Sequence, residues 1–189
     1  MTEENKLKYV SNWYLFIPFF GLVFPDILSF FGILNGRDAV TYYGDIHKNH
    51  TNKILHMTLL PFAAYGYALG VPALFKLSYD DAALIRNWFY ITFIIHYYSI
   101  NAGITAIFAI IYFFPLYFSH IHYKPTFRIA LEGIGIGTSL MIVMEYIGHT
   151  LFEIDNSRPE GVLNAILYSH FFITEEWVRL IYMPGAFTN

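Results

Sequence analysis

The chain contains no cysteine, which excludes disulfide scaffolds, cysteine-ligated zinc sites, thiolate nucleophiles and iron–sulfur clusters. Charge is also scarce: Asp, Glu, Lys and Arg make up 13% of the 189 residues, against about 25% in an average soluble domain. The net charge of −3 excludes a basic nucleic-acid-binding protein, so we expect no nucleic-acid partner. Hydrophobic residues reach 56% and aromatic residues 20%, which excludes a disordered chain and indicates an integral membrane protein.

Long apolar stretches predict an all-α, polytopic membrane protein with about four to six membrane helices. They cover residues 13–34, 57–77, 87–119 and 129–152, with loops at 78–86 and 119–128 and an amphipathic stretch at 162–182. Residues 1–38 are predicted as an extra N-terminal apolar segment, interrupted by Pro18, Pro25 and Asp26. Residues 39–189 are predicted as a single membrane domain.

The stretch 87–119 is 33 residues long and carries no charge. One straight helix of that length would measure about 50 Å, whereas the hydrocarbon core of a bilayer is about 30 Å thick. The length therefore predicts a helical hairpin that turns near Asn101-Ala102-Gly103. With this hairpin, His56 and His149 emerge on the same face of the membrane and can share a site.

The first polar cluster has the pattern His47-x-Asn49-x-x-Asn52-x-x-x-His56. If a helix begins near Asn49, then Asn49, Asn52 and His56 fall on one face, and His47 lies just before the helix in a loop that can fold over that face. Histidine is the commonest metal ligand, so this pattern is compatible with a metal site. The alternative is a polar loop at headgroup level, with Asn49 or Thr51 as the helix N-cap.

The second cluster is Glu145-x-x-x-His149-x-x-x-Glu153, which places an acid, an imidazole and an acid on one helical face. Two carboxylates beside a histidine suit a metal site, either as ligands or with one acid orienting the ligand. The alternative is a histidine held by one carboxylate at the membrane boundary.

The remaining histidines are better explained by packing than by metal binding. His96 is expected to be buried against a tyrosine, His120 and His122 to lie in a headgroup loop across the membrane from His56, and His170 to contact a partner or headgroups. The sequence does not assign His50 a role. Gly133-Ile-Gly135-Ile-Gly137, inside an apolar helix, indicates close helix packing.

Taken together, the two clusters resemble the membrane-bound 2-hydroxy fatty acid dioxygenases of the endoplasmic reticulum. The first family signature reads here Tyr42-Tyr43, His47, Asn49, Asn52, His56 and Pro61. The second reads Gly148-His149, Phe152-Glu153, Arg158-Pro159 and Glu176. The two signatures occur in the family's order and together cover roughly residues 42–182.

The resemblance implies a small multi-helix membrane protein that binds Fe(II) and uses O2 to shorten a 2-hydroxy fatty acid by one carbon. It implies His47, His56 and His149 as iron ligands, Glu153 as a ligand or supporting acid, and Asn49 and Asn52 as residues that orient the site. The implied partners are a fatty acyl substrate and membrane lipid, and the implied location is the endoplasmic reticulum.

The chain also departs from the family pattern. Glu145 stands where the family tends to have glutamine, His50 and His170 stand at proline positions, and two extra residues precede Arg158-Pro159. These differences, and the added residues 1–38, leave a second hypothesis open. In it the chain is a non-catalytic accessory subunit of a larger membrane complex, such as a respiratory or ATP synthase assembly of the mitochondrial inner membrane.

Overall fold

The computed structural model describes residues 40–41, 44–153 and 162–182, and within these ranges the chain is helical, with no strand. The helices are α4 (His50–Leu74), α5 (Tyr79–Tyr98), α6 (Ala102–His122), α7 (Phe127–Ile142), the π-helical turn η2 (Val143–Gly148), α8 (His149–Phe152) and α9 (Val162–Tyr182). The segment 1–38, the pair Tyr42-Tyr43 and Arg158-Pro159 lie outside the described residues.

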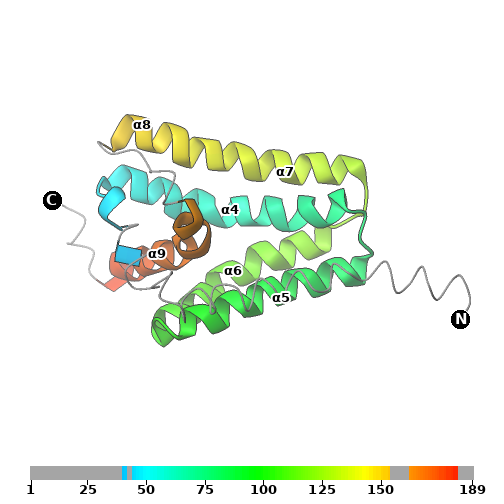
Figure 1. Cartoon of the computed structure of the whole chain (residues 1–189), viewed down its shortest axis with the longest axis horizontal. Helices are drawn as coiled ribbons and strands as arrows, with labels where there is room; N and C mark the ends of the chain where they lie inside the picture. The colour runs from blue at the N-terminus through cyan, green and yellow to red at the C-terminus, as the bar shows by residue number, and fades with distance from the viewer. Residues whose placement is uncertain (1–39, 42–43, 154–161, 183–189) are drawn as a thin grey trace, which may run out of the picture.

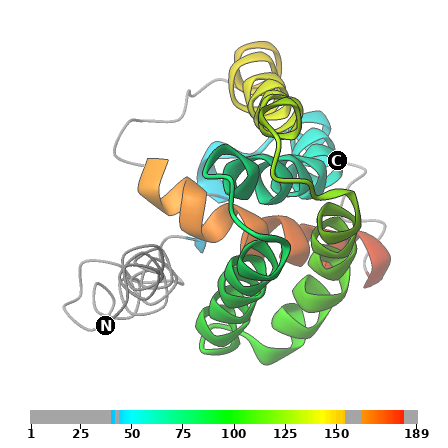
Figure 2. The ribbon, with the colours of Figure 1, turned by 90° about the vertical axis from the view of Figure 1, so that its right-hand side faces the viewer.

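Helices α4, α5, α6 and α7 lie side by side along the long axis of the molecule (Figure 1). Helix α9 lies across one end of this bundle, at the start of α4, and contacts α4 and α6 (Figure 2). Helix α8 continues α7 to the same end. The beginning of α4, the end of α7–α8 and α9 therefore meet at one end of the bundle, where both histidine clusters lie.

The predicted hairpin is confirmed, because α5 ends at Tyr98 and α6 begins at Ala102 with Asn101 as its N-cap. The predicted loop at 78–86 is wrong, since α5 already begins at Tyr79. Its start is fixed locally: the Ser78 hydroxyl accepts a hydrogen bond from the Asp81 N–H, and Asp80 and Asp81 suit the positive end of the helix dipole. His120 and His122, also predicted in a loop, form the last turn of α6.

Side-chain caps set the starts of the other long helices as well. Asn49 accepts from two backbone N–H groups of α4, Asn101 caps α6 and Thr126 caps α7. Each satisfies N–H groups that the first helical turn leaves without a partner. The predicted helix start near Asn49 is therefore confirmed, with Asn49 and not Thr51 as the N-cap.

Four glycines allow α4 and α7 to pack backbone against backbone. A Cβ atom at Gly66 would lie 2.6 Å from the Gly137 nitrogen, and one at Gly133 would lie 2.7 Å from the Gly66 carbonyl oxygen and 2.5 Å from the Gly70 nitrogen. Only glycine permits this approach. The packing role expected for the α7 glycines is confirmed at Gly133 and Gly137, whereas Gly135 faces open space.

Two prolines inside α4 each free a carbonyl that another helix then satisfies. Proline lacks the N–H that would bond four residues back, so Pro61 leaves the carbonyl of Met57 free and Pro72 leaves that of Ala68. Trp177 of α9 donates from Nε1 to the Met57 oxygen at 3.3 Å. Arg86 of α5 donates from Nη1 to the Ala68 oxygen at 3.3 Å.

The outer surface of the bundle is apolar, as a lipid-facing surface requires. Exposed large side chains include Phe62, Ile110, Phe114, Leu131, Tyr146 and Leu151. By length and composition, His50–Leu74, Ala102–His122 and Phe127–Phe152 can each cross a membrane, and α5 runs antiparallel beside α6 in the same bundle. The chain is therefore an all-α polytopic membrane protein.

The stretch 129–152 is not one regular α-helix. After α7 the chain makes the π-helical turn at 143–148, followed by one turn of α-helix and an extended Glu153. Such single π turns inside helices are frequent at functional sites. The expected arrangement of two acids and His149 on one helical face is therefore wrong at Glu153, which lies past the helix end.

Candidate metal centre

Three histidines from separate parts of the chain meet at the end of the bundle. His47 precedes α4, His56 lies on its second turn and His149 follows the π turn, and all three are buried, with at most 1% of their surface exposed. The Nε2 atom of His47 lies 3.1 Å from Nε2 of His149 and 3.4 Å from Nε2 of His56. One ligand atom from each of the three lies within 4.8 Å of the others.

These separations fit neighbouring ligands of one metal ion. Imidazole nitrogens bind a divalent ion such as zinc at about 2.0–2.1 Å. Two ligands at that distance lie about 3.0 Å apart at a right angle and about 3.4 Å apart at a tetrahedral angle. The buried triad of His47, His56 and His149 can therefore hold a metal ion without large movement of the rings.

The backbone fixes which nitrogen of His56 is available. Nδ1 of His56 lies 3.0 Å from the Asn52 carbonyl oxygen, which can only accept a hydrogen bond. Nδ1 therefore carries the proton, and in the neutral ring Nε2 presents its lone pair to the other two histidines. Metal-binding histidines are commonly held in this way, with the second ring nitrogen donating to a carbonyl or carboxylate.

Glu145, in the π turn, faces the triad. Its Oε1 lies 3.5 Å from Nε2 of His56 and its Oε2 lies 3.6 Å from Nε2 of His149. The carboxylate thus lies close to the same ring nitrogens that face the centre of the triad. Its side chain is 31% exposed, so Glu145 lies between the buried histidines and the surface.

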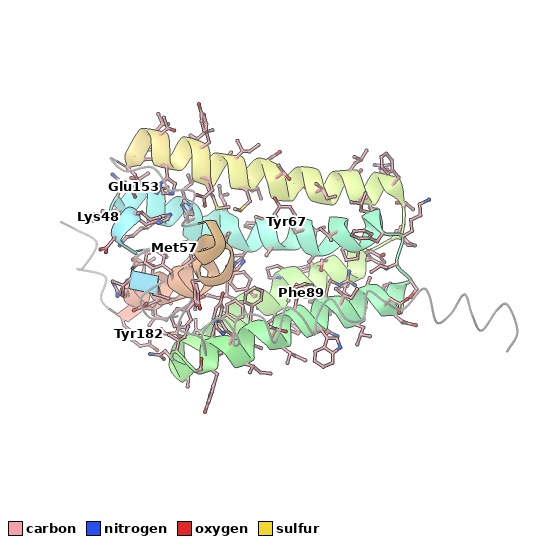
Figure 3. All side chains as sticks on the ribbon, viewed as in Figure 1. Lys48, Met57, Tyr67, Phe89, Glu153 and Tyr182 are labelled. Carbon is pink, nitrogen blue, oxygen red and sulfur yellow. The ribbon has the colours of Figure 1, made fainter. Side chains whose placement is uncertain are left out.

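Glu153 organises the start of α4 instead. Its Oε1 accepts hydrogen bonds from the Asn49 backbone N–H at 3.0 Å and from Asn52 Nδ2 at 3.1 Å. Its Oε2 accepts one from the Lys48 backbone N–H at 3.3 Å. Figure 3 shows Lys48 and Glu153 together at this end of the molecule. A carboxylate at a helix N-terminus also interacts favourably with the helix dipole. Glu153 therefore joins α8 to the loop that carries His47.

Asn52 links the two clusters through its packing. It is fully buried, and its side chain lies directly against Gly148, the residue before His149. A Cβ at Gly148 would collide with the Asn52 Oδ1 atom and would lie 3.2 Å from Leu55 Cδ2. Packing thus explains why a glycine precedes His149: without a side chain at residue 148, Asn52 and His56 of α4 can approach the chain at His149.

Four other histidines in the described residues make different contacts. His96 is buried with its Nε2 3.2 Å from the Tyr168 hydroxyl, as expected for a histidine packed against a tyrosine. The expectation that His170 contacts a partner or headgroups is wrong: its ring lines the cavity inside the bundle, and its Nδ1 pairs with the Tyr112 hydroxyl at 2.8 Å. His120 and His122 lie at the opposite end of the bundle from the triad, as predicted, near Tyr79 and Tyr65 respectively.

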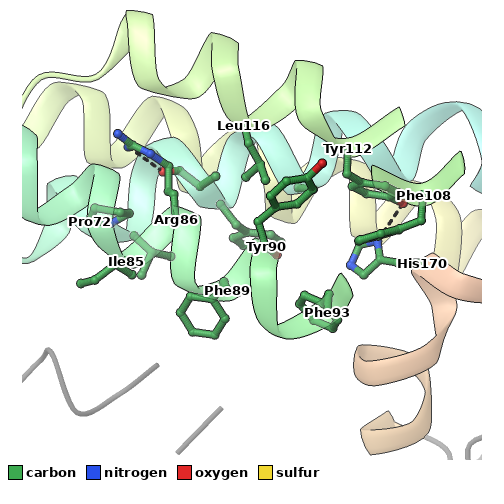
Figure 4. A pocket seen from close by; sticks show the side chains of 14 residues that line it. Pro72, Ile85, Arg86, Phe89, Tyr90, Phe93, Phe108, Tyr112, Leu116 and His170 are labelled. Carbon is green, nitrogen blue, oxygen red and sulfur yellow. Dashed lines mark hydrogen bonds between the residues drawn. The ribbon is translucent and has the colours of Figure 1, made fainter. Parts of the chain in front are cut away.

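An apolar cavity of about 300 Å³ lies between α4, α5, α6 and α9. Figure 4 shows Arg86 toward one end and His170 at the other, with Phe89 and Tyr90 between them and Phe108 and Tyr112 beside His170. Its wall on α4 begins at Ala64, eight residues from His56, which corresponds to about 12 Å along the helix. The cavity and the triad are therefore neighbouring features of one bundle.

No protein-family model, curated protein or solved structure matches this chain. Its class therefore comes from the described geometry: an all-α membrane protein with a buried three-histidine centre that can hold a metal. The resemblance to 2-hydroxy fatty acid dioxygenases stays a prediction.

Sequence reasoning missed several residues that build the site. Gly66 and Gly70 form a small-xxx-small pattern in α4 that was readable from the sequence and pairs with the pattern in α7. Trp177 and the π turn gave no local signal. Glu176, which the sequence analysis placed in the second signature, is buried and pairs with Lys53 at 3.3 Å, and this ion pair joins α9 to α4.

Proposed function

We propose that the chain is an Fe(II)-dependent membrane oxygenase that shortens 2-hydroxy fatty acids by one carbon with O2. The observation that carries the proposal is the convergence of the Nε2 atoms of His47, His56 and His149 in a buried site. Imidazole suits iron, and sites with open coordination positions are typical of non-haem iron oxygenases. The substrate class comes from the resemblance in the two histidine signatures, which also implies the endoplasmic reticulum as the location.

With O2 as the only oxidant, the reaction balances. A 2-hydroxy acid and one O2 yield the acid one carbon shorter, one CO2 and one H2O, and the four electrons lost by the substrate reduce both oxygen atoms. When bound, Fe(II) would supply O2 activation and coordination positions for the substrate's oxygen atoms.

The residues of the chain prepare this centre in three ways. The Asn52 carbonyl holds the proton of His56 on Nδ1, so that Nε2 is free to bind. Glu153 fixes the loop of His47 by accepting backbone N–H groups. The surrounding helices exclude bulk water, because the three rings are buried.

The substrate is an amphiphile, which suits this architecture. An acyl chain can reach the protein from the bilayer through the apolar outer surface. The apolar cavity between α4, α5, α6 and α9 has the size and lining of a site for part of an aliphatic chain. Its wall starts about two helical turns of α4 from His56.

The proposal is tested by metal content and turnover of the full chain in detergent. Anaerobic loading with Fe(II) is required, because zinc outcompetes iron at such sites. We expect about one iron per chain, loss of most of it in His56→Ala and in His149→Ala, and O2-dependent conversion of 2-hydroxypalmitate to a 15-carbon acid with release of CO2. His122→Ala, at the other end of the bundle, is the matched control and should retain iron.

Wild-type protein that is folded but binds no iron would contradict the proposal and favour the accessory-subunit hypothesis. Iron-loaded protein without turnover of any 2-hydroxy acid would refute the substrate class while leaving the metal centre intact.

A further inference from the structure

Glu145 brings negative charge to a place where lone pairs already converge. Nε2 of His56 presents a lone pair, because its Nδ1 proton is committed to the Asn52 carbonyl. The Glu145 oxygen 3.5 Å from that nitrogen carries a negative charge and lone pairs of its own. Two such atoms repel each other unless a positive ion or a proton lies between them.

The position of the carboxylate is that of a ligand rather than of a supporting acid. An acid that orients a metal-binding histidine contacts the ring nitrogen that points away from the metal. Glu145 instead contacts Nε2 of both His56 and His149, the nitrogens that face the centre of the triad. Its distances of 3.5 and 3.6 Å are close to the roughly 3.0–3.4 Å expected between neighbouring ligands of one ion.

The second acid of the cluster is already engaged. Glu153 accepts hydrogen bonds from the backbone N–H at the start of α4 and from the Asn52 side chain. Glu145 lies in the π turn with its side chain partly exposed, so it can move a few tenths of an ångström toward the triad without disturbing the core. Of the two, Glu145 is the acid placed to bind the ion.

Charge supports the same assignment. Three neutral imidazoles leave a divalent ion with its full charge in a buried, apolar setting, which is unfavourable. One carboxylate ligand reduces the net charge of the centre to +1. Mixed histidine and carboxylate donors are also the usual ligands of non-haem Fe(II) in oxygenases.

We propose that Glu145 is the fourth protein ligand, so that the centre has three imidazoles and one carboxylate. The inference rests on the proposed metal-binding function and makes it specific to this chain, because the resembled family tends to have glutamine at this position. Four protein ligands would still leave open coordination positions on the ion for the substrate and O2.

The test measures metal affinity, not activity. Fe(II) is titrated anaerobically into the full chain against a competing chelator, with wild type, Glu145→Gln and Glu145→Asp. We expect Glu145→Gln to weaken binding by about 100-fold, the upper end of what loss of a supporting residue costs. Glu145→Asp retracts the carboxylate by about 1.5 Å and should weaken binding to a similar degree, because ligation depends on contact and not on charge alone. Glu132→Gln changes an exposed acid on α7 and should bind as wild type does.

A second measurement identifies the ligand directly. The infrared difference spectrum between iron-loaded and iron-free protein should contain a shifted carboxylate band that disappears in Glu145→Gln and remains in Glu132→Gln. Wild-type affinity in Glu145→Gln, with His56→Ala unable to bind, would overturn the assignment of Glu145 and leave the three-histidine centre in place. Wild-type affinity in Glu145→Asp, with weakened binding in Glu145→Gln, would also overturn the assignment of Glu145 as a ligand, because a nearby negative charge without direct contact would then be enough for metal binding. Absence of iron binding in the wild type would overturn both this assignment and the proposed function.

Discussion

Substitution of Gly133 by alanine tests the backbone contact on which the α4–α7 pair depends. The new Cβ would lie 2.5 Å from the Gly70 nitrogen, whereas ordinary contacts begin at 3.4 Å, so the two helices must separate locally by about 0.9 Å. Overpacking of this kind costs about 1–3 kcal/mol. For a chain of this length that corresponds to a decrease in Tm of roughly 3–10 °C.

Gly135→Ala is the matched control, because it makes the same chemical change on the same helix and its Cβ meets nothing within 4 Å. It should leave Tm unchanged or raise it slightly, since alanine favours a helix over glycine by up to about 1 kcal/mol. The assay is thermal unfolding of the purified protein in detergent, followed by circular dichroism. Equal Tm values for the two variants would refute the close contact between α4 and α7.

Three further predictions concern the site, the end helix and the topology. Glu153→Gln replaces one acceptor oxygen by an NH2 group that faces backbone N–H donors, so it should lower Tm by roughly 2–6 °C. It should also weaken Fe(II) binding, because the loop that carries His47 is no longer held in place. Unchanged Tm and unchanged affinity would contradict the role of Glu153 at the start of α4. Trp177→Phe removes the donor to the Met57 carbonyl that Pro61 leaves free, and it should lower the free energy of unfolding by about 1 kcal/mol. In a Pro61→Ala background the same change should cost no stability, because the backbone of α4 then satisfies that carbonyl. An equal cost in both backgrounds would exclude this explanation. Single cysteines at Ser78 and Lys124, in this cysteine-free chain, should react with an impermeant thiol reagent from one side of the membrane and a cysteine at Asn101 from the other, and reaction of all three from one side would contradict the hairpin.

The fold was readable from the sequence where length and charge constrain it. A charge-free stretch of 33 residues cannot cross a bilayer once, and the turn before Ala102 follows. The loop predicted at 78–86 failed because charged residues at a helix start resemble a loop in composition. There, Asp80 and Asp81 are favourable first-turn residues of α5 behind the Ser78 cap.

The site was readable only in part. The spacing of Asn49, Asn52 and His56 relative to a helix start indicated that a loop carrying His47 can fold over the same face, and the structure places His47 Nε2 3.4 Å from His56 Nε2. The meeting with His149 required the α4–α7 packing, which depends on contacts between segments that are distant in the sequence. The π turn at 143–148 was not predicted, because its residue types carry no known signal for a π-helical hydrogen-bond register.

The two glutamates beside His149 show what spacing alone cannot decide. Both lie four residues from the histidine, and on a regular helix they would be equivalent neighbours above and below the ring. The helix ends at Phe152, so Glu153 turns away to the N–H groups at the start of α4, whereas Glu145 stays in the π turn and faces the ring nitrogens. One acid therefore holds the loop of His47 and the other faces the centre of the triad. The difference between the two acids arises from where the helix ends. Because residue 145 faces the ring nitrogens of the triad, a glutamate there brings a negative charge to the centre, which a glutamine would not.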